Sequence, residues 1–214
     1  MTRTQPFTAR SLALGVTAMA LVVLASNILV QYPFQVTIGN YDLADLLTWG
    51  AFTYPAAFLV TDLTNRRFGA TAARWVVFVG FCVAVALSVV LSNPRIALAS
   101  GSAFLVAQML DIFVFDRLRR SSWWKAPFIS SFLGSALDTV VFFGIAFSMA
   151  FAFLGHGDEF ATGQAPLLGL FGIEAPRWIS WAIGDFAVKM LVSLTLLAPY
   201  RLLMQVIRPM PAVA

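Results

Sequence analysis

Four ionisable side chains lie inside apolar stretches of the sequence: Asp111, Asp138, Asp185 and Lys189. A charged residue at the centre of a membrane-spanning helix costs about 2.5–3.5 kcal/mol on insertion scales, so four isolated charges would cost on the order of 10 kcal/mol. That sum is comparable with the whole stability of a typical protein, about 5–15 kcal/mol. The four groups must therefore pair with one another or line a wet cavity. Their chemistry would be ion pairing, hydrogen bonding to a polar solute, or proton transfer.

The spacing of these groups leaves two interpretations open. Asp185 and Lys189 are four residues apart and can pair on one helix face, whereas Lys189 can alternatively reach Asp138 on another helix. One interpretation is an internal ion-pair network that fixes how the helices pack. The other is a polar pocket for a flat polar solute, with walls formed by aromatic residues at helical spacing from the polar ones. These aromatic residues are Phe104, Phe115, Phe142 and Trp181.

The composition places these groups in a membrane protein. The 214 residues are 60% hydrophobic and only 11% charged, the mean hydropathy is +0.84, and the apolar residues form long blocks. We expect an all-α polytopic membrane protein with one domain, in which Pro55 kinks the second helix and can open a cavity. The six transmembrane helices are expected at about 12–30, 46–61, 75–91, 97–115, 128–154 and 178–203.

The positions of the cations predict the orientation. Only Arg95 and Arg177 are expected on one side of the membrane, and by the positive-inside rule the richer side, with both termini, is cytoplasmic. At about 1.5 Å per residue, Asp138 and Lys189 share a level near mid-membrane, while Asp111 lies in the cytoplasmic half. The cations of the richer side are Arg3, Arg10, Arg66, Arg67, Arg74, Arg117, Arg119, Arg120, Lys125, Arg201 and Arg208.

The sequence contains few features typical of an enzyme or of a cofactor-binding protein. There is no Gly-x-Gly-Asp motif, no phosphate-binding P-loop, and the one histidine, His156, falls in a loop rather than a span. His156 with Asp158 and Glu159 would bind a metal only weakly, and a solvated loop is favoured. Cys82 has no partner for a disulfide. We expect no enzyme activity, cofactor, metal or nucleic-acid partner.

Four stretches together resemble one family. They are TYPAAFLVTDLTNRRFG (53–69), AFLVAQMLDIFVFDRLR (103–119), SSFLGSALDTVVFFGIAF (130–147) and the spacing Asp185-x-x-x-Lys189. The chain from residue 25 to 200 resembles the queuosine precursor transporter family, also called the VUT family, of bacterial inner-membrane proteins with six predicted spans. The resemblance implies uptake of 7-cyano-7-deazaguanine and 7-aminomethyl-7-deazaguanine, bases used to make the tRNA nucleoside queuosine.

The resemblance also implies site residues. Thr61, Asp62 and Asn65 match the motif that ends the second span, and a departure follows it, because many members read Asn-Glu-x-Tyr-Gly where this chain has Asn65-Arg66-Arg67-Phe68-Gly69. Asp62, Asn65 and Pro55 are expected to form a gate or a coupling site. The residues expected to bind substrate are Asp138, Gln108, Asp111, Asp185, Lys189, Thr139, Trp181 and Phe142.

The implied substrate suits these side chains. A 7-deazaguanine presents a ring N–H beside an exocyclic amine, one carboxylate can accept from both, and the amide of Gln108 suits the carbonyl. Asp138 is the first choice of acceptor because it is deepest. Another carboxylate would couple proton entry, although facilitated diffusion stays open. The alternatives are a substrate-binding subunit of an ATP-driven vitamin-type importer and a non-transporting scaffold, and both a monomer and a homodimer remain open.

Overall fold

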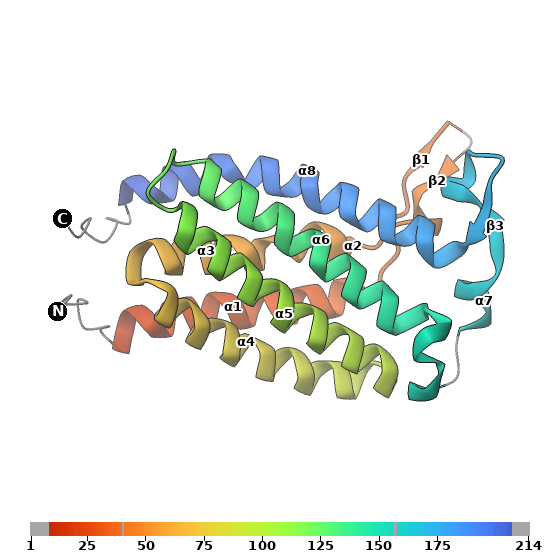
Figure 1. The fold of residues 1–214 in the computed structure, drawn as a ribbon, viewed down its shortest axis with the longest axis horizontal. Coiled ribbons are helices and arrows are strands. Elements are labelled where there is room, and N and C mark those ends of the chain that lie inside the picture. The colour runs from red at the N-terminus through yellow and green to blue at the C-terminus, as the bar shows by residue number, and fades with distance from the viewer. Residues whose placement is uncertain (1–8, 40, 156–157, 207–214) are drawn as a thin grey trace.

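A computed structural model describes residues 9–39, 41–155 and 158–206. Within these ranges, five helices are long and apolar enough to cross a membrane, and they lie side by side along one bundle (Figure 1). The chain is therefore an all-α polytopic membrane protein. The five helices are α1 (Ala9–Leu29), α4 (Ala70–Leu91), α5 (Pro94–Leu118), α6 (Lys125–Phe147) and α8 (Arg177–Val206).

The second predicted helix is interrupted at Pro55, although Tyr54 before it keeps helical dihedrals (φ −56°, ψ −40°). The sequence predicts one helix over 46–61, but the structure has α2 (Trp49–Thr53) and α3 (Pro55–Phe68), which meet at Tyr54. Pro55 starts α3 because its missing N–H is tolerated in a first helical turn. The sequence predicted that this helix ends at residue 61, before its charged residues. In the structure Asp62 is buried against other helices, and α3 continues for six residues beyond it, to Phe68.

The helix predicted over 128–154 is also shorter than expected. Helix α6 ends at Phe147, and a separate 3₁₀ helix, η2 (Met149–Leu154), follows it. The guanidinium of Arg95 donates to the carbonyls of Ile145 (2.9 Å), Ser148 (2.6 Å) and Gly155 (3.3 Å), so it ties the end of α6 to both ends of η2.

Two tight turns connect the helices that lie next to each other. The side chain of Asn93 accepts from the backbone N–H of Ile96 at 2.9 Å, and Pro94 is the first residue of α5. Helices α4 and α5 therefore form a tight hairpin. Between α3 and α4 a single residue, Gly69, takes φ = 85°, a backbone conformation that favours glycine.

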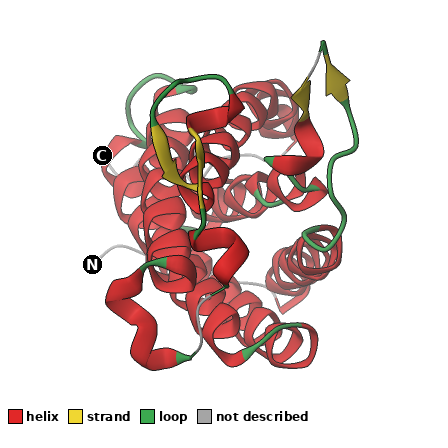
Figure 2. Cartoon of the chain, turned by 90° about the vertical axis from the view of Figure 1, so that its right-hand side faces the viewer, coloured by secondary structure: helices red, strands yellow, loops and turns green. Residues whose placement is uncertain are grey.

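Small elements gather at the end of the bundle away from the chain termini (Figures 1 and 2). They include two antiparallel hairpins and cover the ends of the long helices. These elements are β1 (Thr37–Ile38), β2 (Tyr41–Asp42), η1 (Leu43–Asp45), α7 (Glu159–Thr162), β3 (Gln164–Pro166), η3 (Leu167–Gly169) and β4 (Glu174–Pro176).

The bundle is apolar outside and partly polar inside, as a lipid-embedded protein requires. Large apolar side chains such as Phe78, Val90 and Val140 are exposed. Helices approach closely at Gly134, where an added Cβ would lie 2.7 Å from Cε1 of Phe58. The polar side chains with no more than 1% exposure are Thr61, Asp62, Asn65, Gln108, Asp111, Ser130 and Ser135.

Candidate functional site

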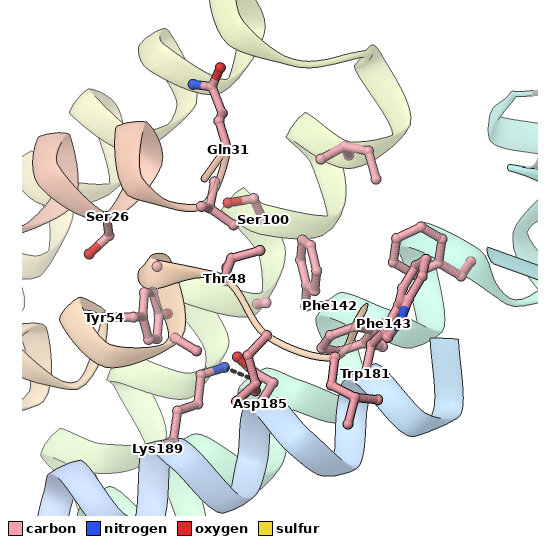
Figure 3. Close-up of a pocket in the computed structure, with 18 of the residues that line it drawn as sticks. Ser26, Gln31, Thr48, Tyr54, Ser100, Phe142, Phe143, Trp181, Asp185 and Lys189 are labelled. Carbon is pink, nitrogen blue, oxygen red and sulfur yellow. Dashed lines mark ion pairs between the residues drawn. The ribbon is translucent and has the colours of Figure 1, made fainter. Parts of the chain in front are cut away.

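A cavity of about 880 Å³ opens at the end of the bundle that carries the hairpins and closes near mid-bundle. Its size is that of a small-molecule site. The mouth includes Gln31, Asp42 and Asp45, and the closed end is formed by Tyr54, Asp138, Asp185 and Lys189 among others. Figure 3 shows Lys189 and Asp185 together on α8, with Tyr54 across the cavity from them.

An ion-pair network forms the closed end. The ammonium of Lys189 lies 2.7 Å from Oδ2 of Asp138 and 2.5 Å from Oδ2 of Asp185. The hydroxyl of Tyr54 donates to Oδ1 of Asp138 at 2.7 Å, and that of Thr139 donates to Oδ2 of Asp185 at 3.0 Å. The structure thus makes both of the pairings that the spacing allowed, within one helix and between α6 and α8.

The two carboxylates of this network differ in how many of their oxygens are free to accept a further hydrogen bond. Both oxygens of Asp138 already accept a hydrogen bond, from Tyr54 and from Lys189. Oδ1 of Asp185 has no such partner among the described residues, and the Asp185 side chain is 17% exposed against 7% for Asp138. Two carboxyl groups share one ammonium, so with both ionised the closed end has one excess negative charge, and Asp185 keeps a free acceptor oxygen.

Aromatic rings form one wall of the cavity (Figure 3). Trp181 donates from its indole N–H to the backbone carbonyl of Asp45 at 2.7 Å, and its ring lies 5.7 Å from that of Phe147 at an interplanar angle of 78°. Phe142 and Phe104 also line the cavity, as the sequence predicted. Phe115 does not, because it packs with Tyr200 in a separate apolar cluster.

Gln108 and Asp111 lie away from the cavity lining. Both are fully buried on α5, and the Thr61 hydroxyl donates to Oε1 of Gln108 at 2.6 Å. The sequence placed them on the wall of the pathway, but the cavity closes above them. The reason is that α3 packs directly on this face of α5, a contact that spacing within α5 cannot reveal.

The residues expected to form a gate occupy the same closed region. Asn65 donates from its amide to the carbonyl of Ile112 at 3.2 Å, and the hydroxyl of Ser130 lies 3.4 Å from Oδ1 of Asp62. Pro55 starts α3 and lines a much smaller cavity, described below. None of these three lines the large cavity in the part of the chain that is described.

Tyr54 is the main site residue that the sequence analysis missed. Its ring lies 5.0 Å from Nζ of Lys189, and its hydroxyl holds Asp138, so it contacts both members of the central pair. The available signal was an aromatic residue with a polar tip directly before Pro55. His156 lies outside the described residues, where its metal interpretation has no test, and Asp158 caps α7 by accepting from the N–H groups of Phe160 and Ala161.

Membrane-length helices around a charged, solute-sized cavity define a membrane protein of the small-solute transporter class. The chain belongs to the family described as "Putative vitamin uptake transporter", whose model matches residues 48–93 and 86–203. The family assigned from the sequence motifs is thereby confirmed.

Curated relatives carry a more specific name. The chain is 35% identical over 200 residues to the "Queuosine precursor transporter" of Escherichia coli, across 84% of this chain and 79% of the relative. It is 34% identical over 205 residues to the "Probable queuosine precursor transporter" of Haemophilus influenzae, across 83% and 79%. A relative of the same name from Bacillus subtilis is 26% identical, across 72% and 69%. No solved structure matches the chain.

Proposed function

We propose that this chain is a multi-pass transporter of the bacterial inner membrane that imports 7-cyano-7-deazaguanine and 7-aminomethyl-7-deazaguanine for tRNA modification. The names of its relatives support this class of substrate. The observation that carries the proposal is the free carboxylate oxygen of Asp185 at the closed end of an aromatic-walled cavity. No observation favours a subunit of an ATP-driven importer.

The closed end suits the hydrogen-bonding edge of the base. The ring N–H and exocyclic amine of a 7-deazaguanine are adjacent donors, which one carboxylate can accept together. We assign this role to Asp185 in place of Asp138, whose oxygens hold Tyr54 and Lys189. Trp181 and Phe142 would contact the faces of the flat base. The excess negative charge also favours the cationic aminomethyl group.

The orientation proposed from the sequence fits this use of the cavity. Helices α2 and α3 together cover residues 49–68, which is about 30 Å at 1.5 Å per residue, so we propose that they form the sixth crossing of one domain. Some of the described cations line the cavity or its mouth, and Arg95 lies at the same end of the bundle. All the other described cations lie at the end that carries both termini. This distribution supports a cytoplasmic placement of that end. The cavity then opens to the periplasm.

Uptake by cells tests the proposal. Cells that neither make nor otherwise import 7-deazaguanines should accumulate labelled base when they express this chain. Asp185→Asn replaces the free carboxylate oxygen and should reduce uptake at least tenfold. Asp116→Asn, on a side chain that is 48% exposed, is the matched control and should take up base normally. Normal uptake by well-expressed Asp185→Asn would remove the assignment of the acceptor, and no uptake by the wild type would remove the substrate class.

A further inference from the structure

A second pair of carboxyl groups lies deeper in the bundle than the cavity. Asp62 on α3 is 1% exposed and Asp111 on α5 is 0% exposed, and neither lines the large cavity. Two hydrogen bonds between α3 and α5 flank them, from Thr61 to Gln108 at 2.6 Å and from Asn65 to Ile112 at 3.2 Å, and their carboxyl groups interact electrostatically. Neither residue contacts the substrate in the proposed mode of binding.

The pair has no direct contact with a counter-charge among the described residues. Among the described residues, no ion pair forms with either carboxylate, and neither oxygen of Asp111 meets a donor in hydrogen-bonding geometry. The hydroxyl of Ser130 approaches Asp62 only at 3.4 Å. Arg66, one turn further along α3, is directed elsewhere, because it donates to the hydroxyl of Tyr200 at 2.9 Å and to the carbonyl of Arg119 at 2.7 Å.

Such an arrangement requires a proton. Two adjacent carboxyl groups removed from water cannot both ionise, so one proton is shared between them, as in other carboxyl pairs. A shared proton also supplies the donor that Asp111 lacks. The other charged or titratable groups that face the pair are Arg66 and Tyr200. With one proton bound, the two carboxyls and the guanidinium of Arg66 sum to zero charge.

A separate small cavity with a mixed polar and apolar lining reaches one member of this pair, Asp62. It has a volume of about 10 Å³, about that of a single water, and lies between α3, α6 and α8. Its lining includes Asp62, Ser131, Ser193 and Tyr200, and the hydroxyl of Ser193 has no hydrogen-bond partner in the described structure. Tyr200 in this lining accepts a hydrogen bond from Arg66, in the last turn of α3, at 2.9 Å.

We propose that Asp62 and Asp111 form a proton-binding site, separate from the solute cavity, whose proton is bound and released during the transport cycle. The coupling to transport rests on the function proposed above. The link is mechanical: Tyr54 directly precedes α3, which carries Asp62, and α6 carries their partners Asp138 and Ser130. A movement of α3 against α6 that opens the cavity floor therefore also changes the surroundings of the carboxyl pair.

Infrared spectroscopy of the purified protein tests the site itself. The wild type should show the carbonyl stretch of a protonated carboxylic acid, shifted in deuterium oxide. Asp62→Asn and Asp111→Asn should each lose this band. In each variant the amide N–H of Asn donates to the remaining carboxylate, so that carboxylate no longer needs the shared proton. Asp116→Asn should keep the band. The proposal is overturned if the wild type lacks the band or if both Asn variants retain it, and the wild-type spectrum decides the matter even where a variant does not fold.

Transport in liposomes tests the coupling. In the wild type, an inward proton gradient should drive accumulation of labelled base at least tenfold over the level without a gradient, in sodium-free buffer. Asp62→Asn and Asp111→Asn should lose this accumulation while they still exchange base across the membrane. Gradient-driven accumulation by the variants, or a requirement for sodium in the wild type, would overturn the coupling. Absence of all exchange in the wild type would instead count against the proposed substrate, while the infrared result would stand.

Discussion

Lys189 holds the closed end of the cavity together, so its replacement by Met is the most informative perturbation of stability. Its ammonium pairs with Asp138 at 2.7 Å and with Asp185 at 2.5 Å, and its side chain is only 6% exposed. Met keeps much of the volume but leaves both carboxylates without a counter-ion. Removing one partner of a buried ion pair costs about 3–5 kcal/mol, a large part of a typical stability of about 5–15 kcal/mol.

Charge separates this effect from a loss of packing. In the wild type, two carboxylates and one ammonium sum to −1; Lys189→Met makes the sum −2, and Asp138→Asn makes it 0. We therefore expect Lys189→Met to destabilise the protein far more than Asp138→Asn. The double variant returns the sum to −1 and should recover part of the loss.

The assay is the thermal unfolding midpoint of each purified variant in the same detergent. The expected order is wild type, Asp138→Asn, the double variant and then Lys189→Met. Lys125→Met, at an exposed position, is the matched control and should unfold close to the wild type. The reasoning would be refuted if Lys189→Met unfolded at the wild-type midpoint, or if Asp138→Asn were as unstable as Lys189→Met.

Three further predictions concern the same region. Tyr54→Phe removes the 2.7 Å hydrogen bond to a charged partner, Asp138, so it should cost about 1.5–3 kcal/mol of stability and weaken uptake; an unchanged unfolding midpoint and unchanged uptake would contradict this. Asp138→Asn should fold yet abolish cellular uptake of labelled base, since it loosens both Tyr54 and Lys189; normal uptake by a well-expressed variant would count against it. Gly134→Ala places a Cβ 2.7 Å from Phe58 and should cost about 1–3 kcal/mol, whereas Gly144→Ala, with nothing within 4 Å, should be neutral, and equal unfolding midpoints for the two would disprove the close approach.

Depth along a helix was enough to predict the central ion pair. Asp138 and Lys189 were placed at one level by counting residues from the helix ends, and the structure joins them at 2.7 Å. The hairpin at Asn93-Pro94 was equally predictable, because capping and the fixed φ of proline are local properties.

Other features depend on contacts between helices, which the spacing of residues within one helix does not predict. The hydroxyl of Tyr54 reaches Asp138 on α6, which is distant in the sequence, so this bond follows from helix packing rather than from a motif. Asp138 was favoured as the acceptor because it is deep, but depth does not say which oxygen is already occupied. Gln108 and Asp111 were assigned to the pathway, and the packing of α3 on α5 encloses them instead.

Uptake into liposomes by the purified protein tests the central claim most directly. The account predicts saturable uptake of labelled 7-deazaguanine without ATP, competed by both the 7-cyano and the 7-aminomethyl base. Asp185→Asn should reduce this uptake at least tenfold, and Asp116→Asn should not. Failure of the wild-type protein to transport by itself, or full uptake by Asp185→Asn, would contradict the account.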